Sequence, residues 1–233
     1  MKRFIVGLLT VAMLVTLIPV AAFAGETEER LVYQSSTNFS IETGDGTWDD
    51  GIWAAQVLNP DTDTYTNLTY GMSYGNWSAD GTAEADVYGV NENMNDHVVG
   101  AYRIQPPSNG RWANVDTRTH YAVKTFTAPK AGNITITSDK GGITPADGSK
   151  PKVRIRKGNA DGSYTVLMQE AQLGTQGVVF DTGSISTTIA EGETIHFEIV
   201  RTAAYKPADS TEKDSKYGAY VKAYWDPIIN NGT

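Results

Sequence analysis

In the stretch Thr194-Ile195-His196-Phe197-Glu198-Ile199-Val200, polar and apolar side chains alternate strictly from Thr194 to Ile199. A period of two places successive side chains on opposite faces of an extended strand, one face buried and the other in water. We expect the three isoleucine and phenylalanine side chains to lie in a core and His196 and Glu198 to face solvent. On this interpretation, replacing Phe197 is costly and replacing His196 costs little.

The same alternation recurs in other short runs, which Gly, Pro and Asp turns separate from one another. No stripe with helical periodicity appears after residue 24. Short alternating strands joined by turns are typical of antiparallel sheets packed face to face. The pattern therefore predicts an all-β fold, a two-sheet antiparallel β-sandwich. Its predicted core residues are Ile134, Ile136, Val153, Ile155, Ile195, Phe197, Val221 and Ala223.

Strands and loops can be placed along the chain from this pattern. A tight hairpin turn is expected at Asn159-Ala160-Asp161-Gly162. Two long polar segments, 76–95 and 105–117, are expected as loops, and long loops on a β-scaffold often carry function. Exposed loops are also expected over 139–151 and 205–214. The expected strands are 31–36, 52–58, 68–74, 120–128, 132–138, 152–157, 164–169, 177–188, 193–201 and 216–225.

The first 24 residues have the layout of a secretory signal peptide. Lys2 and Arg3 precede an uncharged apolar run from Phe4 to Val20, and the small-residue site Ala22-Phe23-Ala24 follows. The apolar run is long enough that an uncleaved membrane anchor stays an alternative. The abrupt change to an acidic segment after the small-residue site favours cleavage. We therefore expect a secreted, extracellular protein.

Cleavage would leave 233 − 24 = 209 residues, which suits a single β-sandwich domain over 25–233. The leader holds two of the 19 basic residues and none of the 27 acidic ones, so the mature balance is 17 − 27 = −10. Such an acidic chain argues against nucleic acid as a partner. The sequence has no cysteine, so its stability must come from packing. We expect a monomer that does not insert into a membrane after removal of the leader.

Several sequence blocks follow one another in a definite order. They are Trp48–Trp53, Met72–Trp77, Thr127–Gly132 with Ile134–Ile136, Lys152–Arg156 with Tyr164, Ile189–Phe197 and Tyr224–Ile229. In this order the blocks resemble secreted bacterial jelly-roll modules of the carbohydrate-binding kind, which are commonly appended to polysaccharide-degrading enzymes. The resemblance implies a jelly-roll sandwich with a glycan-related role, and it supplies no catalytic mechanism. It also makes a structural calcium ion plausible, without assigning its ligands.

Aromatic side chains are candidates for stacking on the apolar faces of sugar rings. Trp48, Trp53, Trp77 and Trp225 fall in blocks that recur with the fold, so packing in the core or at a sheet edge is the favoured role for each. Trp112 lies outside the blocks in a Pro, Gly and Asn loop, and it is either an exposed platform or a loop anchor. The candidate ligand-binding residues are Trp112, Tyr74, Trp77 and Arg111.

A calcium loop would place its first three ligands at alternate positions, as Asn59, Asp61 and Asp63 are placed. The match ends there, because Thr64 stands where the loop needs a glycine and Tyr70 where it needs a bidentate glutamate. A solvated turn is the favoured interpretation. A second acidic turn, around Asp45-Gly46, is interpreted in the same way.

Catalytic patterns are weaker still. The three histidines, His97, His120 and His196, lack the spacing of a zinc site. Glycoside hydrolysis needs two carboxylates flanking a cleft, and nothing in the sequence singles out such a pair. The chain has neither a Gly-x-Ser-x-Gly elbow nor a phosphate-binding glycine loop. We therefore expect no catalytic residues.

The sequence favours a secreted, non-catalytic carbohydrate-binding module that recognises a polysaccharide or a cell-envelope glycan. The alternative from another class is a structural or adhesive envelope module without saccharide specificity, and a hydrolase or lyase is the third. An aromatic-lined surface would favour the first over the second. A cleft with two facing carboxylates would favour the third.

If the small-residue site Ala22-Phe23-Ala24 is cleaved, the exported protein begins at Gly25. Mass spectrometry of the exported protein measures this directly. Recovery of intact residues 1–24 in a membrane fraction would identify a tethered surface protein instead.

Overall fold

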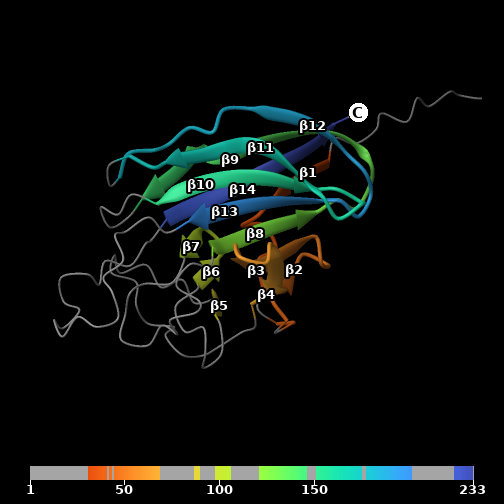
Figure 1. The fold of residues 1–233 in the computed structure, drawn as a ribbon, viewed down its shortest axis with the longest axis horizontal. Helices are drawn as coiled ribbons and strands as arrows, with labels where there is room; N and C mark the ends of the chain where they lie inside the picture. The colour runs from red at the N-terminus through yellow and green to blue at the C-terminus, as the bar shows by residue number, and fades with distance from the viewer. Residues whose placement is uncertain are drawn as a thin grey trace, which may run out of the picture.

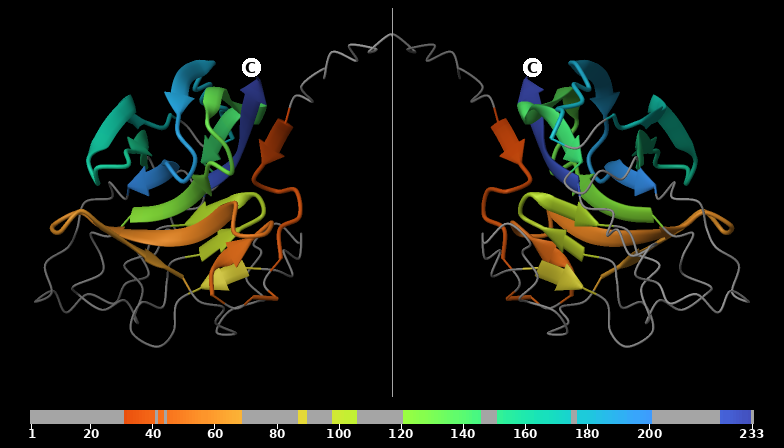
Figure 2. Two further views of the ribbon diagram at one scale, coloured as in Figure 1. Left: turned by 90° about the vertical axis from the view of Figure 1, so that its right-hand side faces the viewer. Right: turned by 90° about the vertical axis from the view of Figure 1, so that its left-hand side faces the viewer.

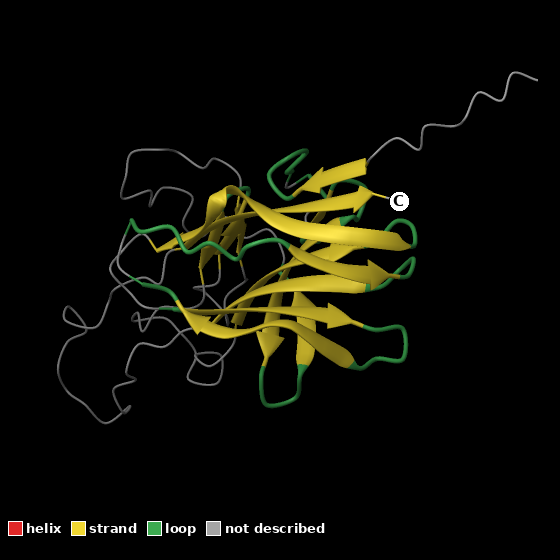
Figure 3. Ribbon diagram, turned by 90° about the horizontal axis from the view of Figure 1, so that it is seen from above, coloured by secondary structure: helices red, strands yellow, loops and turns green. Residues whose placement is uncertain are grey.

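The computed structural model describes residues 31–40, 42–43, 45–68, 87–89, 98–105, 121–145, 151–174, 177–200 and 223–232. Within these residues the regular structure is all β-strand, without helix (Figures 1 and 3). Two antiparallel sheets of seven strands each form a β-sandwich, and the predicted fold class is confirmed. In the described part of the chain, no helix is long and apolar enough to cross a membrane.

The first sheet has the strand order β12-β9-β14-β7-β6-β5, and β1 pairs with β14 beside this path. Figure 2 shows β1, in red-orange, next to the deep blue strand β14. The strands of this sheet are β1 (Leu31–Gln34), β5 (Val87–Gly89), β6 (Val98–Gly100), β7 (Arg103–Gln105), β9 (Gly132–Pro145), β12 (Ile185–Ile189) and β14 (Ala223–Gly232).

The second sheet has the order β11-β10-β13-β8-β3-β2, and β4 pairs with the far side of β3. From β8 onward the chain crosses repeatedly between the two sheets, as in a jelly roll: β8 and β9 lie in different sheets, and so do β12 and β13. The strands of the second sheet are β2 (Thr47–Trp48), β3 (Trp53–Asn59), β4 (Thr64–Asn67), β8 (Tyr121–Thr127), β10 (Lys152–Gly158), β11 (Tyr164–Gln172) and β13 (Thr194–Val200).

The core lies between the sheets and follows the period of two in the sequence. The predicted core residues that the structure describes are all buried: Ile134, Ile136, Val153, Ile155, Ile195, Phe197 and Ala223. The eighth, Val221, lies outside the described residues. Trp48, Trp53 and Trp225 are also buried, so the packing role favoured for them is confirmed.

Aromatic rings connect the two sheets within this core. Trp53 in β3 lies 5.4 Å from Phe126 in β8 and 6.1 Å from Phe197 in β13, between ring centroids. Phe197 in turn meets Trp225 of the opposite sheet edge to face, at 5.2 Å. Such pairs add about 0.5–1.5 kcal/mol each beyond the burial of apolar area.

One core position carries a charge. Lys124 faces inward from β8 and is completely buried. Its Nζ donates hydrogen bonds to the Ala101 carbonyl at 2.7 Å, the Trp225 carbonyl at 2.9 Å and Ser35 Oγ at 3.1 Å. Ser35 Oγ donates in turn to the Asp226 carboxylate at 2.9 Å. A buried ammonium is tolerated when its protons have acceptors, and here it links three separate parts of the chain.

Several predicted boundaries are wrong. The loop expected over 139–151 begins too early, because β9 continues to Pro145 and pairs with β14 along its length. The strand expected over 177–188 is confined to Ile185–Ile189, preceded by a single bridge between Phe180 and Ile143. Short strand β5 lies inside the segment 76–95 that was expected as a loop.

The β3–β4 hairpin also differs from expectation. A strand was expected over 68–74, and of these residues the structure describes Leu68 alone. The observed strand β4 comes earlier, at Thr64–Asn67, directly after the turn that resembled part of a calcium loop. The hairpin turn predicted at 159–162 is confirmed: Gly162 has a φ of 82°, which favours glycine, and its N–H donates to the Asn159 carbonyl at 2.9 Å.

Replacing Phe197 with alanine should lower the free energy of unfolding by about 3–5 kcal/mol, because the cavity would lie between two tryptophans. Val166→Ala on β11 is the control, since Val166 is 41% exposed and should change stability by no more than about 0.5 kcal/mol. Chemical denaturation measures both. Equal small effects would mean that the register of β13 is wrong.

Candidate functional site

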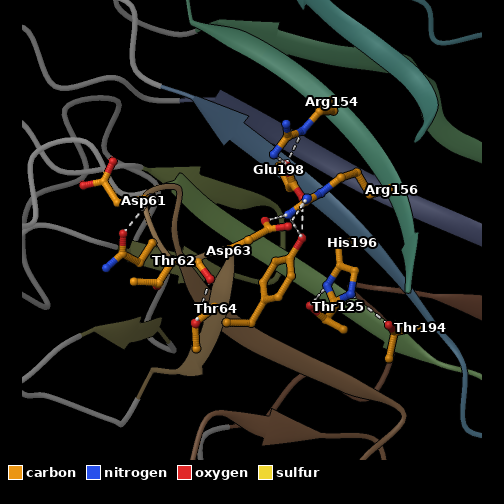
Figure 4. A network of polar contacts seen from close by, with 12 residues as sticks. Asp61, Thr62, Asp63, Thr64, Thr125, Arg154, Arg156, Thr194, His196 and Glu198 are labelled. Atoms are coloured by element: carbon orange, nitrogen blue, oxygen red, sulfur yellow. Dashed lines mark hydrogen bonds and ion pairs between the residues drawn. The ribbon is translucent and has the colours of Figure 1, made fainter. Parts of the chain in front are cut away.

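The outer face of the second sheet carries an unusual concentration of charge. Strands β10 and β13 are antiparallel neighbours, with Arg154 opposite Glu198 and Arg156 opposite His196. These four residues alternate with core residues and therefore share the face that points away from the sandwich interior. We call them, together with Asp63 and Tyr65, the outer-face network (Figure 4).

Glu198 is the centre of the outer-face network, and its side chain is fully buried. One carboxylate oxygen accepts hydrogen bonds from Arg156 Nε at 2.7 Å and from the Tyr65 hydroxyl at 2.5 Å. The other oxygen accepts from Arg154 Nε at 2.6 Å and pairs with Arg154 Nη2 at 2.5 Å. A carboxylate offers about four lone-pair positions, so Glu198 is fully satisfied without water.

The β3–β4 hairpin covers this face. Asp63 lies in its turn and Tyr65 on β4, yet they reach Arg156 on β10 and Glu198 on β13, strands that lie beyond β8 in the sheet order. Asp63 holds the Arg156 guanidinium with two oxygens, at 2.8 Å and 3.1 Å. Figure 4 shows the Asp63 carboxylate directed at Arg156. The hairpin must therefore fold over the sheet instead of extending its plane.

The ionisation of these groups follows from their contacts. The hydrogen bond from Arg156 lowers the pKa of Asp63. Burial, and then the charge of Glu198, raise the pKa of Tyr65, so its phenol stays protonated and donates. Burial alone would lower the pKa of Arg156, but Asp63 and Glu198 raise it. The two arginines of the network lie in ion-pair contact with its two carboxylates.

His196 lies at one end of the network and is neutral. Thr125 Oγ1 donates to Gln56 Oε1 at 2.6 Å and so accepts the proton of His196 Nδ1 at 3.0 Å. His196 Nε2 then accepts from the Thr194 hydroxyl at 2.8 Å. Burial, and the nearby charge of Arg156, lower the pKa of His196 to about 3. The hydrogen bonds hold the His196 ring in one orientation, and the lowered pKa indicates that the ring is neutral.

Tyrosine rings pack around this histidine. The Tyr65 ring is stacked on His196 with centroids 3.9 Å apart, and Tyr164 meets it edge-on at 5.7 Å. The Arg156 guanidinium lies over the Tyr164 ring, 4.4 Å from its centroid. A cation so placed attracts the ring and limits its rotation. Tyr164 is therefore held in one orientation although it is only partly buried.

A pocket of about 320 Å³ opens beside Tyr164 and His196. Two turns form its rim, the β10–β11 turn and the turn that precedes β13. Gly158 lies against it, and a Cβ there would come within 2.4 Å of Thr194 Oγ1 and 3.1 Å of His196 Nε2. The pocket is lined by Gly158, Asn159, Ala160, Gly162, Ser163, Tyr164, Glu191, Gly192, Glu193, Thr194 and His196.

The structure does not test the residues that the sequence predicted to bind a ligand. Trp112, Tyr74, Trp77 and Arg111 fall outside the described residues, so their assignment stays a prediction. The described residues contain no group of three or more His, Cys, Asp or Glu side chains placed to hold a metal ion.

In the turn that resembled the start of a calcium loop, the side-chain oxygens of Asn59 and Asp63 are engaged within the protein. Asn59 Oδ1 accepts from the Asp61 N–H at 2.9 Å, and both oxygens of Asp63 bind Arg156. The turn therefore connects β3 to β4 and places Asp63 over the sheet.

One sequence expectation about this face is wrong. His196 and Glu198 were expected in water, but they are 4% and 0% exposed. They do point away from the interior, and the β3–β4 hairpin then covers them. The alternation of the sequence gives the side of the sheet correctly, and it does not show whether another segment packs on that side. Replacing His196 is accordingly no longer expected to be harmless.

Removing the charge of Glu198 should destabilise the protein, because Arg156 is only 6% exposed and would lose a counter-ion. Glu198→Gln is expected to lower the free energy of unfolding by about 3–5 kcal/mol. Glu170→Gln removes an exposed pair with Lys152 and should cost no more than about 1 kcal/mol. Denaturation of both variants tests this, and equal costs would contradict a central role for Glu198.

Comparison with known proteins finds no protein-family model and no curated protein that matches the chain. Several solved structures are similar to it, and two of them are described here. One is a family 35 carbohydrate-binding module from Clostridium thermocellum, with 11% identity over 48% of this chain and 69% of that one, and a TM-score of 0.27. The other is the K1 cleaved adhesin domain of Lys-gingipain from Porphyromonas gingivalis W83, with 12% identity over 87% of this chain and 99% of that one, and a TM-score of 0.34.

Proposed function

We propose that this chain is a secreted, non-catalytic carbohydrate-binding module, and that the pocket beside Tyr164 holds a sugar residue. The observation that carries the proposal is the aromatic wall of Tyr164 and His196, which contact each other and are bordered by polar turns. Sugars present apolar C–H faces and many hydroxyls, and such a wall with a polar rim complements both.

The size of the pocket supports recognition of a small unit. Ligand pockets commonly measure about 300–1,000 Å³, and this one, at about 320 Å³, is at the lower end. It suits one sugar residue at a chain end or branch better than a long buried segment. Because the network beneath holds Tyr164 and His196 in place, binding would order few additional side chains, which favours affinity.

The chemistry of the lining supports binding without catalysis. A general acid for glycoside hydrolysis needs a raised pKa. The Glu193 carboxylate instead has a lowered pKa, because the Ala190 N–H, Lys157 and the Ala160 N–H donate to it. His196 has both ring nitrogens engaged by threonines and a pKa of about 3, which makes it a weak base at neutral pH.

A second candidate function is a structural or adhesive module without saccharide specificity. The outer-face network favours it, because Glu198 and Arg156 satisfy one another and stabilise the fold without any ligand. The two functions differ in what they require of the pocket. Glycan binding requires an accessible aromatic ring such as Tyr164 beside the pocket, whereas a structural module does not.

A glycan array probed with residues 25–233 should identify a ligand, which titration calorimetry then quantifies for three variants. Tyr164→Ala should weaken binding by about 1–3 kcal/mol, the range for loss of one stacked ring. Tyr121→Ala is the matched control, since Tyr121 lies on the same sheet under Arg154 and does not line the pocket. Trp112→Ala tests the platform predicted from the sequence.

Unfolding midpoints of the same variants separate lost binding from lost folding. Weaker binding in folded Tyr164→Ala, with normal binding in Tyr121→Ala, supports the pocket. Weaker binding in Trp112→Ala alone would move the site to the loop predicted from the sequence. A wild-type protein that binds no glycan would contradict the proposal and favour the structural module.

A further inference from the structure

The charges around the pocket do not cancel completely. The two arginines of the outer-face network face its two carboxylates, and Lys157 pairs with Glu193 at 3.0 Å. Two carboxylates remain. Glu191 lines the pocket and is exposed, and Asp161 lies in the adjacent β10–β11 turn. Within the described part of the chain, neither forms an ion pair.

The local geometry keeps this negative charge at the pocket. Asp161 accepts hydrogen bonds from the Ser163 N–H and hydroxyl, which lower its pKa and hold it ionised without adding positive charge. No lysine or arginine lines the pocket, and its one histidine is neutral. With Glu193 paired to Lys157, the lining keeps the negative charge of Glu191, which favours a positively charged ligand group.

We propose that the pocket selects glycans by charge, favouring a sugar with a protonated amine over its N-acetylated form and rejecting uronic acids. This inference rests on the proposed glycan-binding function and adds the class of sugar to it. Glu191 is the principal selecting residue because it lines the pocket itself, and Asp161 reinforces it from the rim.

The size of the preference follows from the exposure of these groups. A unit charge about 4 Å from another in water gains roughly a fivefold advantage in binding. Glu191 is exposed, so the preference for the amine should be about threefold to fivefold and should shrink at high salt. A uronic acid should bind more weakly than the uncharged, acetylated sugar by a similar factor, because its carboxylate is repelled by Glu191.

The test titrates residues 25–233 with three oligosaccharide probes, made of glucosamine, N-acetylglucosamine or galacturonic acid. Measurements are made at about pH 6, where an amine of ordinary pKa is protonated, and at low and high salt. The glucosamine probe should bind about threefold to fivefold more tightly than the acetylated one at low salt, and the galacturonic acid probe most weakly.

Glu191→Gln should reduce the preference for the amine, and Glu191→Gln with Asp161→Asn should abolish it. Glu170→Gln is the matched control, because it removes the same charge from β11 about 20 Å along the strand from Tyr164, and it should keep the full preference.

The outcomes separate this inference from the function on which it rests. Equal affinity for amine and acetylated probes, or tight binding of the galacturonic acid probe, overturns charge selection while glycan binding stands. A preference that persists in the double variant overturns its assignment to Glu191 and Asp161. Failure of all three probes, with another glycan bound through Tyr164, overturns the sugar class alone. Failure of every glycan on the array overturns the proposed function as well.

Discussion

The outer face of this protein depends on one buried carboxylate. Glu198 has no exposed surface, and an ion removed from water is stable only when its lone pairs are filled. Two arginines and a phenol fill them, and each partner then orients something else. Arg156 extends to Asp63 and fixes the β3–β4 hairpin, and it lies over Tyr164 at the pocket wall. Glu198 therefore influences the pocket wall through Arg156, although Glu198 itself does not line the pocket.

A second buried charge acts on the opposite side of the same sheet. Lys124 stands across from Phe197 in the β8–β13 pairing, one position from the Val123–Glu198 pair, so strand alternation sends the two ions to opposite faces. Apolar side chains alone tolerate sliding between packed sheets, whereas an ammonium must meet its acceptors. Lys124 meets them in the β6–β7 connection, in β14 and after β1. It therefore aligns the sheets that hydrophobic burial brings together.

The fold was predictable from the sequence and the candidate site was not, for a physical reason. Alternation in the strand of Phe197 is a local signal, and it identified the core correctly. The outer-face network joins residues of β4, β10 and β13, which no local pattern connects. Opposite charges at Arg154 and Glu198 were visible in the sequence, but their pairing depends on strand order. Asp63 was assigned to a solvated turn because nothing local indicates that its hairpin folds back over the sheet.

The pairing of β1 with β14 has a mechanical consequence. Leu31 lies opposite Asn231 and Gln34 opposite Ile228, so both ends of the described chain leave the sheet from the same end of one antiparallel pair. A pulling force applied between residues 31 and 232 would break the β1–β14 backbone hydrogen bonds one after another from this end, instead of straining all of them at once. The opening would then reach Asp226, where Gln34, Ser35 and Ser36 are all hydrogen-bonded to one carboxylate. Separating β1 from β14 beyond Gln34 would therefore require these four hydrogen bonds to one carboxylate to break as well.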